Sequence, residues 1–173
     1  MRLNLGCEDK ILSGFVNVDI IRRPGVNLVY DLNKLPLPFK DNSVDYIVCS
    51  HLLEHLINPT VFMHELHRIC KPDAIIDIYV PHFSAFTAYA DLTHKRPGMS
   101  YFVFGDKNFN KSLYNKFKVK KQLNFTRVNY SFLNKFLNPI INFSPVIYER
   151  FLCYLLPCSE IHFRLEVVKQ ARI

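Results

Sequence analysis

Short apolar runs, each bounded by polar or turn residues, follow one another through the first half of the chain. They span residues 2–5, 15–20, 26–30, 44–49 and 74–80, and such runs are typical of buried strands in a parallel sheet. Only nine residues separate the first run from the second, and a parallel crossover that contains a helix takes roughly a dozen or more. The pattern therefore predicts an α/β fold with a mostly parallel sheet, in which the first crossover helix is minimal or absent.

A helical pattern begins at Pro59, a residue suited to the first turn of a helix. Apolar residues recur at helical spacing through residues 61–70, and Lys71-Pro72 ends the pattern. A strand, a helix and a strand in this order form a right-handed parallel unit. We therefore expect this helix to connect the fourth and fifth strands.

The second half of the chain has a different pattern. Residues 116–120 and 161–169 alternate with period two, which predicts strands that have one solvent-facing side. The C-terminal strand is suited to an antiparallel edge of the sheet. Short helices are predicted over residues 83–91 and 145–156, with the aromatic stretch before the second helix interrupted by Pro139.

Composition supports a single globular unit. The chain has 173 residues, of which 49% are hydrophobic, and this length is typical of one domain. We expect one domain over residues 1–173, with a ligand-binding core in 1–82, a substrate and lid region in 83–160 and a final strand in 161–173.

The five cysteines are scattered and form no C-x-x-C pair, which argues against a disulfide framework and a structural zinc site. No apolar run approaches the roughly 18 residues of a membrane span, and the first strand starts directly after Met1, which leaves no room for a signal peptide. These features predict a cytoplasmic protein without a membrane span. Nothing in the sequence indicates its oligomeric state.

Chemically distinctive residues stand where the predicted strands end. Gly6 follows the first strand, and Asp19, Asp31 and Ser50 end the next three. In an open parallel sheet, ligands bind in the crevice beyond these carboxyl ends. Gly6 permits close approach of a ligand to the backbone, and Asp19 is placed to accept hydrogen bonds from a ribose diol. A glycine turn with a strand-end acid indicates adenosine binding; an ordinary strand–turn–strand with a solvated aspartate is the alternative.

The ordered set of motifs resembles the small class I, Rossmann-like S-adenosylmethionine-dependent methyltransferases. The resemblance covers residues 2–82, and a less specific D-x-T-H-x-R-P segment follows at 91–97. It implies a Rossmann-like fold, S-adenosylmethionine as the cofactor and methyl transfer as the activity. The motifs are Leu3-Asn4-Leu5-Gly6-Cys7, Val16-Asn17-Val18-Asp19, Asp31-Leu32, Leu35-Pro36, Pro38-Phe39, Asp41-Asn42-Ser43-Val44-Asp45, Leu53-Glu54-His55 and the helix end from Glu65 to Pro72.

The resemblance implies a role for two strand ends in holding the sugar and methionine parts of the cofactor. Gly6 and the backbone around Cys7 would lie against the methionine and the ribose. Asp19 would hold the ribose hydroxyls, and Ile20 would pack on the adenine.

The third and fourth strand ends would complete the cofactor site. Asp31 would accept a hydrogen bond from the adenine amino group, and Leu32 would contact the base through its backbone. Ser50 and His51 would face the methionine part and the sulfonium. These roles suit a cofactor that has no phosphate and therefore needs no long glycine loop.

One position departs from the family pattern. The family usually has G-x-G where this chain has Gly6-Cys7-Glu8. The Glu8 side chain has four open roles: it points to solvent, pairs with Lys10, meets the ammonium of the cofactor, or fills the cofactor site. The last role would make the protein a cofactor-degenerate binding module.

Histidines near the fourth and fifth strand ends are candidates for the chemistry. We expect His82, Asp91 and His94 to form the catalytic group, in which a histidine oriented by Asp91 deprotonates the acceptor. Binding of a divalent metal by these three side chains is an alternative, and local packing is another. His51 and His55 belong to the same predicted crevice. We assign no metal site.

Basic residues concentrate in the second half. Ten Lys or Arg stand against one acid, Asp106, between residues 95 and 135. A solvated face, an anionic acceptor and RNA binding are the alternatives, but no groove-reading element for a duplex is present. We expect a small-molecule acceptor, such as a sugar or a phosphorylated or lipid-linked compound, rather than a nucleic acid. The aromatic residues 133–156 are expected to form lid and core packing, with a membrane-facing surface as the alternative.

Overall fold

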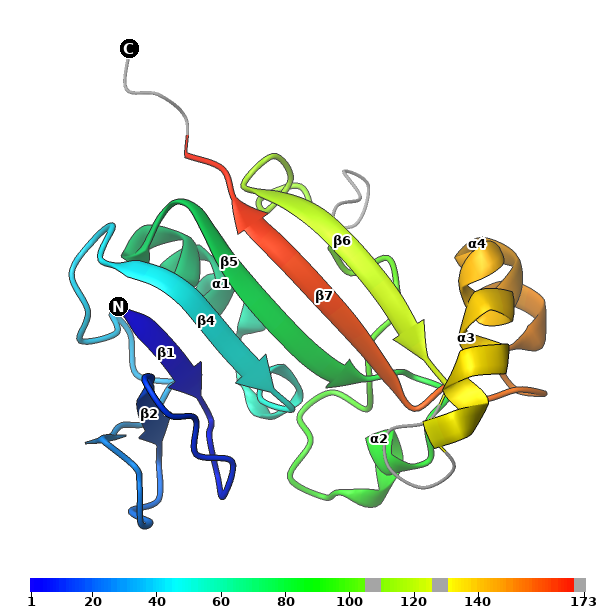
Figure 1. The fold of residues 1–173 in the computed structure, drawn as a ribbon, viewed down its shortest axis with the longest axis horizontal. Helices are drawn as coiled ribbons and strands as arrows, with labels where there is room; N and C mark the ends of the chain where they lie inside the picture. The colour runs from blue at the N-terminus through cyan, green and yellow to red at the C-terminus, as the bar shows by residue number, and fades with distance from the viewer. Residues whose placement is uncertain (105–109, 126–130, 170–173) are drawn as a thin grey trace.

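The computed structural model describes residues 1–104, 110–125 and 131–169, and its strands form one sheet (Figure 1). Seven strands pair in the order β3-β2-β1-β4-β5-β7-β6 within these ranges. The strands are β1 (Arg2–Leu5), β2 (Val16–Asp19), β3 (Leu28–Val29), β4 (Val44–Ser50), β5 (Cys70–Pro81), β6 (Phe117–Asn124) and β7 (Glu160–Val167).

The pairing confirms the predicted fold class. The first five strands run parallel, and β7 is antiparallel to both β5 and β6. The predicted antiparallel strands are thus present as a pair at one side of the sheet. The C-terminal strand β7 is the inner member of this pair, and β6 lies outermost.

The first crossover is a loop, as its length predicts. Residues 6–15 contain no helix, and the backbone N–H groups of Gly6 and Cys7 both donate to the carbonyl of Val18. Hydrogen bonds among three asparagines connect β1, β2 and the residue before β3 beneath this loop. Asn4 Nδ2 donates to Asn17 Oδ1 at 2.8 Å, and the backbone N–H and Nδ2 of Asn17 donate to Asn27 Oδ1 at 2.8 and 3.2 Å.

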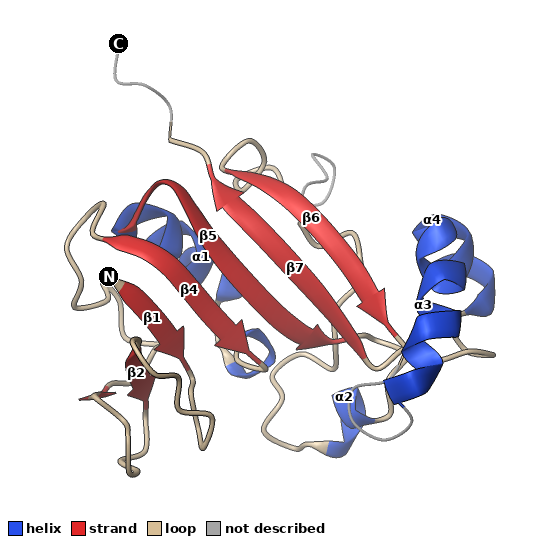
Figure 2. Ribbon diagram, in the orientation of Figure 1, coloured by secondary structure: helices blue, strands red, loops and turns tan. Residues whose placement is uncertain are grey.

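Helices cover the sheet unequally. The longest is α1 (Pro59–Ile69), which is capped by the side chain of Asn58 and buries Phe62 and Leu66 against the sheet. Figure 2 shows α1 behind the sheet and no helix in front of β4 and β5. The other helical segments are η1 (Leu53–His55), α2 (Thr87–Ala90), η2 (Ser131–Leu133), α3 (Asn134–Phe143), α4 (Pro145–Ile147) and the π-helical turn η3 (Tyr148–Leu152).

Two predicted helices are shorter in the structure, and one helix is present that was not predicted. The helix predicted over residues 145–156 is present as α4 and η3, which together end at Leu152. The helix predicted over residues 83–91 is limited to α2, one turn at the end of that range. The segment before Pro145 is helical although it contains Pro139. Asn138 and Asn142 on α3 bind the backbone of β6 and the residue after it, so tertiary hydrogen bonds support a helix that local propensity disfavours.

A buried ion pair ties α1 to the loop before β4. Glu65 Oε1 accepts hydrogen bonds from Leu37 N and Arg68 Nη2, each at 2.6 Å, and Arg68 Nη2 donates to the carbonyl of Phe39 at 3.0 Å. The hydrogen bonds from Arg68 hold the pKa of Glu65 below its ordinary value. The charged carboxylate is therefore the form that stabilises the fold.

We expect Glu65→Gln to lower the free energy of unfolding by about 1.5–3 kcal/mol at neutral pH, the range for hydrogen bonds to a charged group. Because the folded-state pKa is depressed, this stabilisation is present above the unfolded-state pKa and is lost as the pH falls through the folded-state pKa. Urea unfolding at neutral and acidic pH should show the gap between variant and wild type closing in acid. Glu166→Gln, whose carboxylate pairs with Lys118 on the surface, should change little. A pH-independent gap would contradict the assignment.

Candidate active site

A cavity of about 380 Å³ lies at the carboxyl ends of β1, β2 and β3, within the size range of small-molecule sites. Seven of the nine predicted cofactor residues line it: Gly6, Glu8, Asp19, Ile20, Asp31, Leu32 and His51. Cys7 does not line this cavity; its side chain is buried. Ser50 lines a second cavity. The structure thus brings most of the predicted residues into one hollow.

The turn after β1 presents backbone to this hollow. Gly6 has φ of +67°, and a Cβ there would approach Leu52 Cδ1 to 3.0 Å, so this position requires glycine. Asp19 is held by the backbone: its Oδ2 accepts from Glu8 N and its Oδ1 from Ile21 N, each at 2.9 Å. Asp19 is therefore oriented before any ligand arrives.

Glu8 occupies a backbone position that suits glycine. Its φ is 45°, in the left-handed region that non-glycine residues adopt at a cost. The Glu8 side chain is exposed and lines the cavity. Lys10, which is the partner in one of the four roles considered for Glu8, donates from Nζ to Ser50 Oγ at 3.3 Å.

The other end of the cavity suits a flat, polar base. Asp31 Oδ1 accepts hydrogen bonds from the backbone and side-chain nitrogens of Asn33, at 3.0 and 3.3 Å. The Ile20 side chain is 61% exposed and offers an open apolar surface beside the acids. Carboxylate oxygens and an apolar platform together match an aminated aromatic ring.

His51 follows β4 and lies between two buried carboxylates. Its Nε2 is 2.9 Å from Glu160 Oε2, and its Nδ1 is 3.2 Å from Glu54 Oε1. The Glu54 carboxylate is fully buried, and in the described part of the chain its oxygens have no partner with hydrogen-bond geometry. Carboxylates in these positions orient an imidazole and stabilise the imidazolium that forms when it takes a proton. The φ of His51 is 55°, an uncommon conformation that occurs at functional sites.

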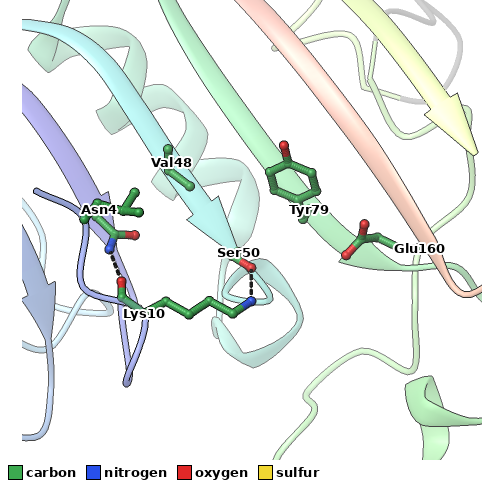
Figure 3. Close-up of a pocket in the computed structure, with 7 residues that line it drawn as sticks. Asn4, Lys10, Val48, Ser50, Tyr79 and Glu160 are labelled. Atoms are coloured by element: carbon green, nitrogen blue, oxygen red, sulfur yellow. Dashed lines mark hydrogen bonds between the residues drawn. The ribbon is translucent and has the colours of Figure 1, made fainter. Parts of the chain in front are cut away.

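A second cavity, of about 270 Å³, opens on the helix-free face of the sheet (Figure 3). Ser50 and His51 are consecutive, yet Ser50 lines this cavity and His51 lines the first. Glu160, which contacts His51, also lines the second cavity. The His51–Glu160 pair therefore connects the two hollows. The lining residues are Asn4, Lys10, Leu12, Val48, Ser50, Tyr79 and Glu160.

Comparisons with known proteins agree with this geometry. Residues 18–78 match a family model described as a methyltransferase domain. This match covers part of the chain and agrees with the class I methyltransferases that the sequence motifs resemble. S-adenosylmethionine is the cofactor of this class, as the sequence motifs predict.

Several solved structures share the fold of this chain over nearly all of its length. A SAM-dependent methyltransferase from Archaeoglobus fulgidus is 19% identical with a TM-score of 0.60, over 95% of this chain and 85% of that one. Phosphoethanolamine N-methyltransferase 2 of Haemonchus contortus, solved with S-adenosyl-L-methionine, is 16% identical with a TM-score of 0.58, over 98% of this chain and 48% of that one. The YcgJ protein of a Bacillus species is 13% identical with a TM-score of 0.58, and the alignment covers 98% of this chain and 92% of that one. No match was found among the curated proteins.

The structure buries His82 completely, which argues against its predicted role as a general base. One ring nitrogen, Nδ1, lies 2.7 Å from Ser84 Oγ, and the other, Nε2, lies 3.2 Å from Glu149 Oε1. Glu149 also accepts from Ser100 Oγ at 2.7 Å. With both nitrogens engaged and no exposed surface, His82 joins the 82–84 turn to η3 and has a structural role.

Asp91 and His94 lie beside the cofactor cavity rather than with His82. Asp91 Oδ1 accepts from Thr93 N and Oγ1 at 2.8 and 2.7 Å, and these bonds hold the pKa of Asp91 below its ordinary value. Thr93 Oγ1 lies 3.0 Å from His55 Nδ1, and His94 Nδ1 donates to the carbonyl of Ala88 at 2.9 Å. The segment around Asp91 therefore positions His55 and Thr93 on the cavity wall.

The group of potential metal ligands also differs from the one considered from sequence. Within the described ranges, Glu54, His55 and His94 each offer a ligand atom, and these atoms lie within 4.8 Å of one another. His82 is not part of this group. Imidazole and carboxylate are ligands that several transition metals accept.

Sequence reasoning missed the two carboxylates around His51. Glu54 stands three residues after His51, a spacing that could have signalled the contact. Glu160 is 109 residues away and reaches His51 only because β7 pairs with β5. No local signal indicates that partner.

Proposed function

We propose that this protein transfers the methyl group of S-adenosylmethionine from the first cavity to a small-molecule acceptor in the second. The observation that carries the proposal is the position of His51, which lines the cofactor cavity and contacts Glu160 in the second cavity. A group placed between two cavities is suited to a reaction between their occupants.

The first cavity offers a partner for each part of the cofactor. Asp19 holds the ribose hydroxyls, while Asp31 accepts from the adenine amino group. Ile20 and Leu32 contact the base. The turn at Gly6 would lie against the methionine part, and a Cβ at this position would meet Leu52, which lines the same cavity.

The chemistry then depends on orientation and proton transfer. When bound, S-adenosylmethionine supplies an electrophilic methyl group on a positively charged sulfur. Positioning supplies most of the rate of such a displacement. His51 accepts the proton that a hydroxyl acceptor loses, and Glu54 and Glu160 hold the imidazole in place and stabilise its charged form.

The second cavity favours a polar, hydroxylated or anionic acceptor. Lys10 places an ammonium group at its rim, and Asn4 and Ser50 add polar groups. Tyr79, which is stacked on His162 with ring centroids 4.3 Å apart, presents an aromatic face. A sugar or a phosphorylated metabolite suits this combination.

Isothermal titration tests the proposal most directly. We expect S-adenosylmethionine and S-adenosylhomocysteine each to bind in a one-to-one complex with micromolar affinity. Radiolabelled methyl transfer to a panel of sugars and phosphorylated metabolites then identifies the acceptor. No binding of either ligand would overturn the proposal and leave a cofactor-degenerate binding module.

We expect Glu8→Gly to strengthen S-adenosylmethionine binding severalfold and to raise the free energy of unfolding by about 0.5–1 kcal/mol, because Glu8 has a left-handed backbone that glycine adopts without strain. Titration and urea unfolding measure the two effects. Glu8→Ala removes the carboxylate but keeps the strained Cβ, so it separates charge from backbone. Weaker binding in Glu8→Gly would mean that the Glu8 side chain contacts the cofactor.

A further inference from the structure

Helix α3 faces the protein with two asparagines and the buried side chain of Ile141. Asn142 Oδ1 accepts from Leu123 N and Asn142 Nδ2 donates to the Leu123 carbonyl, both at 2.8 Å, and Asn138 Oδ1 accepts from Phe125 N at 2.9 Å. These amides satisfy the open edge of β6. A surface helix of a globular protein normally turns its apolar side inward, but α3 fully buries Ile141 alone and leaves most of its apolar residues outside.

The apolar side of α3 consequently faces outward. Phe136, Ile140 and Phe143 are 64%, 58% and 91% exposed, and they recur at helical spacing. Three residues at such spacing form one continuous stripe. These three side chains do not pack in the interior of the protein, so packing within the chain does not explain why they are apolar.

Neighbouring segments extend this stripe into a larger surface, here called the aromatic end. Figure 1 shows α2, α3 and α4 together at one end of the molecule, beyond the carboxyl ends of β5 and β6. The ring of Tyr154 contacts Phe83, and Tyr89 donates its hydroxyl to the Phe83 carbonyl, so the α2 and η3 regions adjoin. The exposed members of the aromatic end are Phe86, Tyr89, Leu92, Phe136, Ile140, Phe143, Val146, Ile147, Phe151, Tyr154 and Leu155.

The same part of the chain carries the positive charge of the protein. Residues 83–159 contain eleven Lys or Arg and three Asp or Glu. One of the acids, Glu149, is engaged with buried His82. Exposed Arg150 lies beside Phe151, with its guanidinium carbon 5.7 Å from the ring centroid, and exposed Lys135 precedes Phe136 on α3. Exposed apolar side chains beside cationic ones match the surface of a lipid bilayer, because the apolar groups can enter the acyl region while the cations contact anionic head groups.

We propose that the aromatic end docks on the surface of a membrane that contains anionic lipids. No helix in the described part of the chain is long and apolar enough to cross a membrane, so the contact is interfacial. A second copy of the chain suits the surface less well, because two such ends face to face would bring like charges together. Docking depends only on this surface and is independent of the proposed methyl transfer.

Vesicle co-sedimentation tests the proposal. The purified protein should sediment with vesicles of equal parts phosphatidylcholine and phosphatidylglycerol, and much less with phosphatidylcholine alone. The double variant Phe136→Glu/Phe143→Glu should lower the partition coefficient by about tenfold or more, because two large apolar side chains no longer enter the interface. Lys135→Glu/Arg150→Glu should reduce binding to the anionic vesicles selectively.

Val61→Glu is the matched control, because Val61 is an exposed apolar residue on α1, outside the aromatic end. It should sediment like the wild type, and circular dichroism should show that every variant is folded. Failure of the wild type to sediment, or equal sedimentation of the Phe136/Phe143 variant, would overturn the proposal. Equal binding to both vesicle types would overturn the role of anionic lipid. A dimer in sedimentation velocity that this double variant abolishes would assign the surface to a second copy.

Discussion

Asp19→Ala should weaken S-adenosylmethionine binding by about a hundredfold or more, since two hydrogen bonds from ribose hydroxyls to a carboxylate are worth about 1.5–3 kcal/mol each. The loss should be large because Asp19 is held by the backbone N–H groups of Glu8 and Ile21 and lies ready in the cavity. Titration calorimetry with S-adenosylmethionine and S-adenosylhomocysteine measures the effect on both forms of the cofactor.

Two further variants test whether the loss of affinity comes from the carboxylate of Asp19. Asp9→Ala removes an exposed carboxylate from the same loop that does not line the cavity, and it should bind like the wild type. Asp19→Asn keeps an acceptor oxygen without the charge and should fall between the two. Unchanged affinity in Asp19→Ala would place the cofactor elsewhere.

His51→Asn should reduce the rate of methyl transfer to a hydroxyl acceptor by about 10²–10⁴-fold, the range for loss of a general base. Asparagine tolerates the left-handed backbone that His51 adopts, so the end of β4 should keep its conformation. The dissociation constant for S-adenosylmethionine should change by less than about fivefold, since only one wall residue is shortened. Single-turnover rates and calorimetry on the same protein separate the two quantities.

His64→Asn provides the matched control for this rate effect. His64 is a partly exposed histidine on α1 and lines neither the cofactor cavity nor the second one. It should have the wild-type rate. A His51→Asn enzyme with an undiminished rate would show that the acceptor loses its proton without help from this residue.

The elements that depend on the pattern of neighbouring residues in the chain could be predicted from the sequence. The short apolar runs identified the parallel strands, and the nine-residue spacing after β1 correctly excluded a crossover helix. The orientation of α3 was not predictable from the sequence. Its helix contains Pro139 and is supported by amide bonds to β6, which exist only after the chain has folded.

The residues of the candidate site likewise fall into two groups: those that local sequence predicts and those that only the folded chain brings together. Gly6, Asp19 and Asp31 follow directly from strand ends, and the structure places them in one cavity. The grouping of His82 with Asp91 and His94 was an inference from closeness in sequence. The β5 strand end instead directs His82 into the protein toward Glu149. The contact of Glu160 with His51 depends on strand pairing and has no counterpart in local sequence.

The three asparagines beneath the first crossover make this part of the sheet sensitive to substitution. A helix covers a sheet through many apolar contacts, so the cost of altering one is shared among its neighbours. At the first crossover, residues 6–15, no helix is present, and a few amide hydrogen bonds among Asn4, Asn17 and Asn27 hold this part of the sheet together. A buried polar group left without its partner costs about 1–3 kcal/mol. The short crossover therefore depends on the buried side chains of Asn4 and Asn17, and a residue at either position that cannot both donate and accept leaves a buried group unpaired.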